Sequence, residues 1–440
     1  MDRRSFVKQS TLAAGGVLMA STLDAKAYAG LADDTIKIGL IGCGGRGTGA
    51  ATQALSTAQN VKLVAMADAF RDRLDSCYDY ITDQTYADSS GEQQSMSGRV
   101  MVDEAHKFVG FDAYKKVLPL VDVVILTTPP GFRPVHFEAA VNAGKHIFTE
   151  KPMAVDAPGV RKVLAAAEKA KKQKLNVVVG LQRRYQTIYT EWVERMREGV
   201  IGDIVTSHVY WNSGGVWTRP REEGQTEMEY QMRNWYYFNW LCGDHINEQH
   251  IHNIDVSNWV KDAYPTHAYG MGGRRMRIGP DTGEIFDHHF VEYDYADGSK
   301  MYSQCRHWQG VANRVTESFQ GTNGSAPKPG TLLTPSGYPI MRYNDKNDPN
   351  PYQVEHDVLF EAIAKGDYKF ADAEHGAKST LTAIMGRMAT YSGQIVTWDE
   401  AMNSEVDLMP ERYTWDAMPK VLPDENGQYP VPTPGITKVV

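Results

Sequence analysis

The feature that most restricts the fold of this chain lies in residues 36–68, where a glycine turn joins an apolar segment to a small, helix-forming one. Gly42, Gly44 and Gly47 form GxGxxG, and a second apolar run, VKLVAMAD, ends at Asp68. Such glycines permit a tight turn, close approach of the backbone to a pyrophosphate, and close packing of helix on strand. The stretch therefore predicts a dinucleotide-binding strand–turn–helix–strand unit.

The acid that ends the second strand indicates which dinucleotide binds. A carboxylate at Asp68 would accept hydrogen bonds from both ribose hydroxyls and repel a 2'-phosphate. The spacing therefore favours NAD over NADP, although Arg71 and Arg73 lie nearby and temper the preference.

The alternation of strands and helices continues after this unit. Apolar runs at 121–130 and 145–152 and at 176–180 alternate with helix-like stretches at 136–144 and 158–172. This pattern predicts a doubly wound parallel sheet. We expect the polar, serine-rich residues 71–108 to form a surface excursion from it.

The pattern changes after about Arg183. Alternating polar and apolar stretches predict an open, mostly antiparallel sheet with one solvated face, covered on the other by a helix over 243–260. We expect the glycine- and proline-rich residues 321–339 to be a loop, and two late helices to pack back on the first domain. The expected divisions are 1–29, a signal peptide; 30–182, an NAD-binding domain; 183–375, a substrate-binding α+β domain; and 376–440, a C-terminal helix and tail.

Composition excludes several classes of function. The 440 residues carry a formal charge of −8 with no basic cluster, so we expect no nucleic-acid partner. No segment after the N-terminal region approaches the roughly 20 apolar residues of a membrane span. The four cysteines have no CxxC spacing, and Cys43 lies inside the glycine turn, so neither a disulfide framework nor a zinc site is expected.

The N-terminus has the pattern of a twin-arginine signal. Arg3 and Arg4 precede Phe6 and Lys8, a modest apolar stretch follows, and AYAG at 27–30 offers a small-residue cleavage site. We therefore predict removal of about 29 residues and export of the folded protein to the periplasm.

The stretch GDHINEQHIHNIDVSNWV, residues 243–260, places His245, Glu248, His252 and Asp255 three or four residues apart. As a helix they would form one stripe. A solvated polar face is one explanation, but apolar residues occupy much of the remaining surface. A buried imidazole and carboxylate one turn apart would instead suit acid–base catalysis. Two further histidines and Glu248 match no zinc spacing, so we predict no metal and expect His245 to bind a substrate hydroxyl.

These residues together resemble the Gfo/Idh/MocA oxidoreductases. The resemblance covers nearly the whole chain after the signal: GxGxxG at 42–47, TTPP, TEKPM at 149–153, GLQRRY at 180–185, ExxxHxxD at 248–255 and SGQIVTWDEA near the end. The family usually has Asp where this chain has Glu248, which keeps a carboxylate but places it on a longer side chain.

The resemblance implies catalytic roles for three residues. Lys151 would bridge the nicotinamide and the reacting hydroxyl, His252 would exchange its proton, and Glu248 would orient His252. Such a base and cation suit hydride transfer from a carbinol carbon. The resemblance and the glycine turn imply cofactor contacts at Gly42, Gly44, Gly45, Arg46, Gly47, Asp68, Thr128, Pro129, His136, Glu150, Lys151 and Arg183.

The substrate is expected to be a sugar or glycoside. Aromatic faces stack on sugar rings, and the chain has aromatic clusters at 211–217 and 235–240. We predict substrate contacts from Trp217, Tyr237, His245 and Asp255. We therefore predict an oxidoreductase that acts on a secondary hydroxyl of a sugar or glycoside, at C3, with tightly bound, internally recycled NAD. The alternative is a redox-neutral NAD-dependent glycosidase. A non-catalytic sugar-binding protein is the least favoured, because the lysine, carboxylate and histidine are all present. The resemblance also implies a homo-oligomer formed through the open sheet face.

Overall fold

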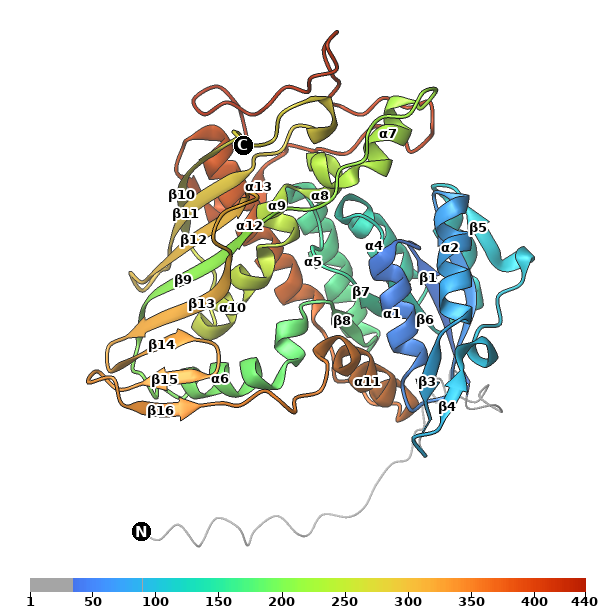
Figure 1. Ribbon diagram of the computed structural model, residues 1–440, viewed down its shortest axis with the longest axis horizontal. Coiled ribbons are helices and arrows are strands. Elements are labelled where there is room, and N and C mark those ends of the chain that lie inside the picture. Colours follow the sequence, from blue (N-terminus) through green and yellow to red (C-terminus); the bar gives the residue numbers. More distant parts are fainter. Residues whose placement is uncertain (1–34, 89) are drawn as a thin grey trace, which may run out of the picture. The chain divides into compact units, whose positions relative to one another are not determined.

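The first domain of the computed structural model, which describes residues 35–88 and 90–440, is built on a parallel sheet (Figure 1). In the described chain this sheet has six strands in the order β5-β2-β1-β6-β7-β8. Its strands are β1 (Ile36–Ile41), β2 (Val61–Asp68), β5 (Lys107–Val109), β6 (Val123–Leu126), β7 (His146–Thr149) and β8 (Val177–Val179). The connecting helices are α1 (Gly45–Leu55), α2 (Arg71–Thr82), α3 (Ala113–Val117), α4 (Arg133–Asn142) and α5 (Ala157–Lys172). The predicted signal peptide lies outside the described residues.

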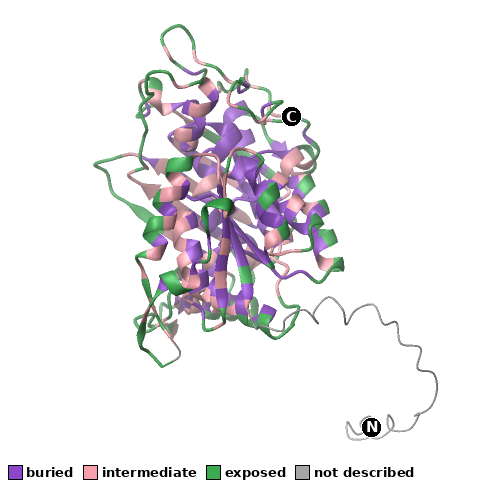
Figure 2. Ribbon diagram, turned by 90° about the vertical axis from the view of Figure 1, so that its right-hand side faces the viewer, coloured by how far each residue is buried: buried purple, intermediate pink, exposed green. Residues whose placement is uncertain are grey.

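The order of the strands locates a ligand site. β1 pairs with β2 on one side and with β6 on the other, so the chain changes direction across the sheet at β1. In open parallel sheets, ligands bind beyond the carboxyl ends of the strands at this switch point. Figure 2 shows these strands buried behind helices that expose one face.

The segment expected to be a surface excursion is more ordered than predicted. It contains α2, the hairpin strands β3 (Thr85–Ala87) and β4 (Gln93–Ser95), and the edge strand β5. Leu74, Cys77 and Ile81 give α2 one buried face. Their spacing of three and four residues is helical, but the many charged residues between them conceal it in the sequence.

A second, mixed sheet dominates the later part of the described chain, with nine strands in the order β16-β15-β14-β13-β9-β12-β11-β10-β17. β9 and β12 pair in parallel, and the other neighbours are antiparallel. The strands are β9 (Ile204–Ser213), β10 (His267–Gly273), β11 (His288–Asp294), β12 (Lys300–His307), β13 (Arg314–Gly321), β14 (Gly324–Lys328), β15 (Thr331–Leu333), β16 (Pro339–Arg342) and β17 (Val396–Thr397).

The prediction that residues 321–339 form a loop is wrong. Short strands β14, β15 and the start of β16 occupy it, separated by turns at Gly330 and Gly337. The glycines and prolines that suggested a loop mark the turns and edge of a sheet, where both residue types are tolerated.

The helices after β8 include two that pack on the second sheet and one that returns to the first domain. They are α6 (Thr187–Arg197), α7 (Glu227–Arg233), α8 (Asn239–Cys242), α9 (His245–Glu248), α10 (Ile251–Lys261), α11 (Pro351–Ala364), α12 (Ala373–Ser392) and α13 (Trp398–Asn403). α11 returns to the first domain, where Gln353 donates a hydrogen bond to the carbonyl of Gln53 (3.0 Å). α12 packs against both α5 and β10. In the described residues, no helix combines the length and apolar character that a bilayer span requires.

The single helix predicted over 243–260 is divided. α9 ends at Glu248 and α10 begins at Ile251, with Gln249 and His250 forming a turn between them. The stripe predicted for an unbroken helix therefore holds only within each part, and this division separates Glu248 from His252.

Candidate active site

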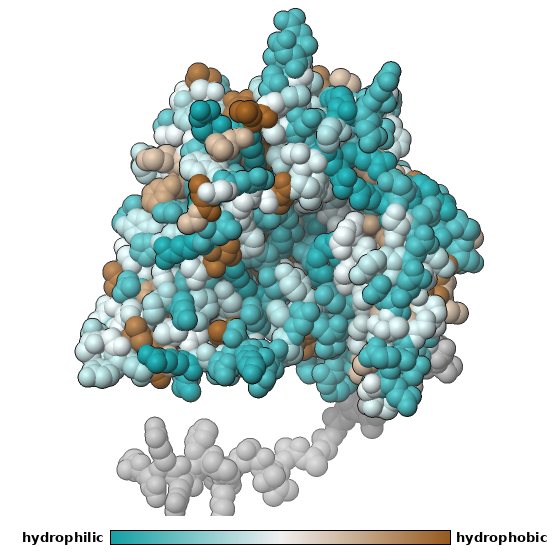
Figure 3. Space-filling model, in the orientation of Figure 1, coloured by the Kyte–Doolittle hydropathy of each residue, from teal (hydrophilic) through white to brown (hydrophobic). Residues whose placement is uncertain are grey.

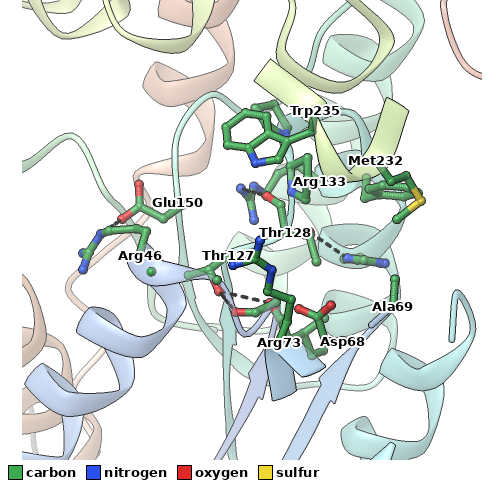
Figure 4. A pocket seen from close by; sticks show the side chains of 18 of the residues that line it. Arg46, Asp68, Ala69, Arg73, Thr127, Thr128, Arg133, Glu150, Met232 and Trp235 are labelled. Carbon is green, nitrogen blue, oxygen red and sulfur yellow. Dashed lines mark hydrogen bonds and ion pairs between the residues drawn. The ribbon is translucent and has the colours of Figure 1, made fainter. Parts of the chain in front are cut away.

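A cavity of about 680 Å³ lies between the glycine turn and the second domain. Figure 3 shows the surface hollowed here among hydrophilic residues, and Figure 4 shows side chains from both domains pointing into it. Predicted residues that line it are Gly42, Gly44, Gly45, Arg46, Asp68, Thr128, Pro129, His136, Glu150, Lys151, Trp217, Glu248 and His252. The cavity therefore brings together most of the residues that the sequence singles out.

Steric contacts explain why the turn requires glycine. Gly42 has a φ of +100°, and a Cβ there would lie 2.5 Å from the backbone nitrogen of Thr128. A Cβ on Gly47 would lie 1.9 Å from the carbonyl oxygen of Gly42, so Gly47 packs the turn and does not itself line the cavity. Gly44 caps α1 without a side-chain hydrogen bond. The first-turn amides of α1 have no partner within the helix and suit an anionic group.

Asp68 is fixed at the end of β2. Its carboxylate accepts hydrogen bonds from the backbone nitrogens of Cys43 (2.6 Å) and Phe70 (2.9 Å). Burial raises the pKa of Asp68, while these hydrogen bonds and the charge of Arg73 act in the opposite direction. Each carboxylate oxygen can still accept from a ribose hydroxyl. Together with the open glycine turn, this carboxylate fits the ribose and phosphates of NAD.

The loop after β6 is held by Arg133, which donates hydrogen bonds to the carbonyls of Leu126 (2.6 Å) and Thr128 (2.7 Å). A hydrogen bond of 3.1 Å joins the Thr128 hydroxyl to Nδ1 of His136. Burial lowers the pKa of His136 to about 3, so its imidazole is neutral at physiological pH. These contacts fix the loop after β6 and the neutral His136 beside the glycine turn.

An ion pair crosses the cavity at the edge of the first domain. Nε of Arg46, in the glycine turn, lies 2.5 Å from Oε1 of Glu150 at the end of β7. The guanidinium also lies 5.0 Å from the ring centroid of Tyr352 on α11. Arg46 thus links the turn to two other elements that line the cavity.

Lys151 reaches from the first domain to the second. Its Nζ lies 2.9 Å from Oε1 of Glu248 and donates to the Glu248 backbone carbonyl at 2.5 Å. Glu248 was expected to orient His252, but the structure pairs its carboxylate with Lys151 and, in the described chain, shows no hydrogen bond to His252. The physical reason is the break between α9 and α10, which disrupts the spacing of a continuous helix.

His252 lines the same cavity from α10 and is only 7% exposed. Its ring stacks against Trp211 at a centroid distance of 5.9 Å, and its Nδ1 has no partner in the described structure. Burial lowers the pKa of His252 well below 6.5, and the positive charges of Lys151 and Arg183 lower it further. The imidazole is therefore neutral at neutral pH and able to accept a proton.

This lowered pKa predicts an unusual pH dependence. If His252 is the base, kcat/KM for oxidation should change by less than about twofold from pH 7.5 to 6.0, whereas an unperturbed histidine would lose about fourfold. Steady-state rates with an uncharged substrate would measure this, and a fourfold loss that is absent in His252→Gln would contradict it.

The lowered pKa of His252 also affects stability. Below about pH 6.5 the unfolded chain binds a proton that folded His252 does not, so the free energy of unfolding decreases as the pH is lowered.

Two predicted contacts are ion-paired away from the cavity. Arg183, predicted to bind the cofactor, makes a close ion pair with buried Glu317. Asp255, predicted to bind substrate, accepts two hydrogen bonds from Arg184 (2.8 and 2.9 Å) and one from Ser379 (2.7 Å). Neither lines the cavity, because each charge is buried and satisfied by a partner from another element.

Two further predicted substrate contacts are also placed elsewhere. The Tyr237 hydroxyl donates to the carbonyl of Val216 (3.2 Å). His245 is fully buried, and its Nδ1 lies 2.7 Å from Asp244. Burial lowers the pKa of His245 to about 4 although the Asp244 charge opposes this. Both side chains therefore form hydrogen bonds inside the protein and do not line the cavity.

Asp244, His245 and His289 bring possible metal-ligand atoms within 4.8 Å of one another. The Asp244 carboxylate, however, also accepts from the Phe286 nitrogen (2.9 Å) and the Tyr391 hydroxyl (2.5 Å). These hydrogen bonds account for the buried carboxylate as part of the protein core.

Several residues that line the cavity were not predicted from the sequence. They lie on different elements, among them α3, α7 and α11, and they include Tyr114, Arg219, Met232, Arg233 and Tyr352. The aromatic runs, which include Trp211 and Trp235, were the only local pattern that pointed to this part of the wall.

Comparison with known proteins agrees with this geometry. Residues 36–179 match the model of the Gfo/Idh/MocA oxidoreductase family, described as an NAD-binding Rossmann fold. An inositol 2-dehydrogenase of Cereibacter sphaeroides is 24% identical over 359 residues, which cover 79% of this chain and 92% of that protein. A glycosyl hydrolase family 109 protein of Shewanella pealeana is 23% identical over 373 residues, 80% of this chain and 71% of the relative.

A solved structure shows the same fold. The aldose-aldose oxidoreductase from Caulobacter crescentus superposes with a TM-score of 0.62 at 18% identity, over 82% of this chain and 99% of that one. Both the parallel sheet that carries the glycine turn and the mixed sheet fall within such an architecture. The chain is therefore an enzyme with an NAD-binding Rossmann domain over residues 36–179, and this domain is similar to that of the Gfo/Idh/MocA oxidoreductases.

Proposed function

We propose that the protein oxidises a secondary hydroxyl of a sugar or glycoside, at C3 of the ring, with NAD as hydride acceptor. The observation that carries this proposal is the convergence of Lys151, Glu248 and His252 on the cavity that also contains the glycine turn. An inositol dehydrogenase and an aldose-aldose oxidoreductase among the similar proteins support a polyhydroxylated substrate.

The side chains have complementary parts in this reaction. When bound, NAD supplies the site that accepts a hydride from the carbinol carbon. Neutral His252 takes the hydroxyl proton as the carbon–oxygen bond becomes a carbonyl. The Lys151 ammonium, positioned by Glu248, stabilises the negative charge that develops on the oxygen. In the reverse direction protonated His252 returns the proton.

Direct identification of product would test this proposal. Purified protein would be incubated with a panel of glycosides and polyols, and a loss of two mass units, located at C3 by fragmentation, is expected for a substrate. No keto product from any sugar or polyol, with NAD shown to be bound, would contradict it.

The family 109 relative gives a specific reason to test a second function. In a redox-neutral glycosidase, transient oxidation at C3 acidifies the C2 proton, the aglycone is eliminated, water adds, and the ketone is reduced back. The same His252 and Lys151 could serve that sequence. Release of aglycone with no net NADH would favour this function over the first.

We also propose that the protein is exported by the twin-arginine route and regenerates its cofactor in place. The support is the Arg3–Arg4 pattern with the AYAG site. Outside the cytoplasm free NAD is scarce, so each hydride must leave on a second carbonyl compound. Cell fractionation of the native protein and of Arg3→Lys/Arg4→Lys would test the route.

A homo-oligomer formed through the open sheet face is the remaining proposal. The outer face of β10 exposes Tyr269 and Met271, which are 53% and 64% exposed. Apolar side chains on an exposed sheet face are typical of protein–protein interfaces. Light scattering on Met271→Lys and the unchanged protein would show whether this face holds subunits together.

A further inference from the structure

One end of the cavity is closed by a segment of the second domain, residues 216–235, that belongs to no recognised nucleotide-binding motif. We name it the cover segment. It contributes Trp217, Arg219, Met232, Arg233 and Trp235 to the cavity wall, which on the other side is formed by Asp68, Phe70 and Arg73 of the first domain. Figure 4 shows Met232 beside Ala69, and Trp235 across the cavity from Arg73 and Asp68.

The cover segment is tied into a closed loop. The hydroxyl of Tyr237 donates to the Val216 carbonyl (3.2 Å), and the Arg219 nitrogen donates to Oδ1 of Asn234 (2.9 Å). The rings of Trp217 and Trp235 lie 6.0 Å apart in an edge-to-face arrangement. These contacts join the two ends of the segment to each other.

A latch joins the cover segment to the first domain. Nη1 of Arg233 lies 2.7 Å from Oδ2 of Asp72, on the first turn of α2. The same guanidinium lies 3.8 Å from the ring centroid of Phe70, two residues after Asp68. Trp415 of the C-terminal tail packs next to this contact. Its ring centroid lies 5.1 Å from that of Phe70 and 4.7 Å from that of Phe111.

The charges at this end of the cavity suit a dinucleotide. Arg73, Arg219 and Arg233 all line it, and burial and the charges of the other two lower the pKa of Arg219. Asp68 lines this end, and Arg233 is paired with both Asp72 (2.7 Å) and Glu229 (3.8 Å). Arg73 and Arg219 form no ion pair in the described chain, so their charges remain available to an anionic ligand. The pyrophosphate of a dinucleotide whose ribose binds Asp68 would relieve the repulsion among these guanidinium groups.

We propose that the cover segment is part of the cofactor site: it encloses the adenosine half of the dinucleotide, and the Arg233–Asp72 latch must open before the nucleotide can leave. This inference rests on the proposed function, because only an enzyme that reoxidises its cofactor in place benefits from retaining it. Arg219 and Trp235 would contact the nucleotide, whereas Arg233 holds the cover closed.

The rate of nucleotide release tests the proposal. The full-length, processed protein would be loaded with radiolabelled NAD and chased with unlabelled NAD, and retained label would be measured after gel filtration. We expect Arg233→Ala to accelerate release by about 3- to 30-fold, the range for loss of an exposed ion pair and a cation–ring contact. Asp72→Asn removes the ion pair alone and should accelerate release by about 1.5- to 5-fold. The double variant should release no faster than Arg233→Ala, since both changes open one latch.

Arg197→Ala is the matched control, since it removes a comparable ion pair (2.8 Å to Asp262) far from the cavity. Unchanged release in both latch variants, or release from the unchanged protein within seconds, would overturn the proposal. Turnover measured with saturating added NAD distinguishes a failure of the cover proposal from a failure of the proposed function. If sugars are oxidised but release is insensitive to the latch, the cover proposal fails alone; if NAD is held but no sugar is oxidised, the proposed function fails alone.

Discussion

Replacing Lys151 with alanine is expected to reduce kcat for sugar oxidation by about 10²–10⁴-fold, and His252→Ala should have an effect of similar size. Both side chains line one cavity, and Lys151 is held by two hydrogen bonds to Glu248. Without the ammonium, charge on the reacting oxygen is not stabilised, and without the imidazole the hydroxyl proton has no acceptor.

Initial rates at saturating NAD, with circular dichroism to verify folding, measure this effect. Lys172→Ala is the control because that lysine is exposed at the end of α5 and does not line the cavity. Lys151→Arg should recover part of the rate, since it keeps the charge but changes the geometry. Wild-type kcat in Lys151→Ala or His252→Ala would remove that residue from the mechanism.

The second large effect concerns stability. Arg184→Ala should lower the free energy of unfolding by about 3–5 kcal/mol, because it leaves the carboxylate of Asp255 buried without its cation. Burial opposes ionisation of Asp255, but the charge and hydrogen bonds of Arg184 outweigh it and lower the pKa of Asp255. The side chain of Asp255 is 2% exposed, so water cannot replace the lost partner.

Thermal and denaturant unfolding would measure this change. Arg197→Ala, which removes an exposed pair to Asp262, should cost less than about 1 kcal/mol. A variant of Arg184 with unchanged stability but a raised KM would instead support the role in substrate binding that the sequence indicated for Asp255.

The contrast between Asp255 and His252 shows which features of the site could be predicted from the sequence. The spacing within 245–255 indicated a line of titratable groups, of which His245, His252 and Asp255 are buried and Glu248 is partly exposed. The spacing could not show that Arg184, 71 residues earlier, forms an ion pair with Asp255, or that Lys151 forms one with Glu248. Periodicity reports which residues share a helix face, but their partners come from other elements and are set by tertiary packing.

The sequence by itself determined the dinucleotide turn, the alternation that builds the parallel sheet, and the acid at the end of β2, because these depend on local requirements. No side chain fits at Gly42 or Gly47, and a strand and helix each need a particular spacing of apolar residues. Only the tertiary structure decided which charged residues face the cavity and which are buried in ion pairs. It also decided that the cover segment meets the first domain, since the Arg233–Asp72 ion pair joins residues 161 positions apart, and no local pattern encodes such a meeting.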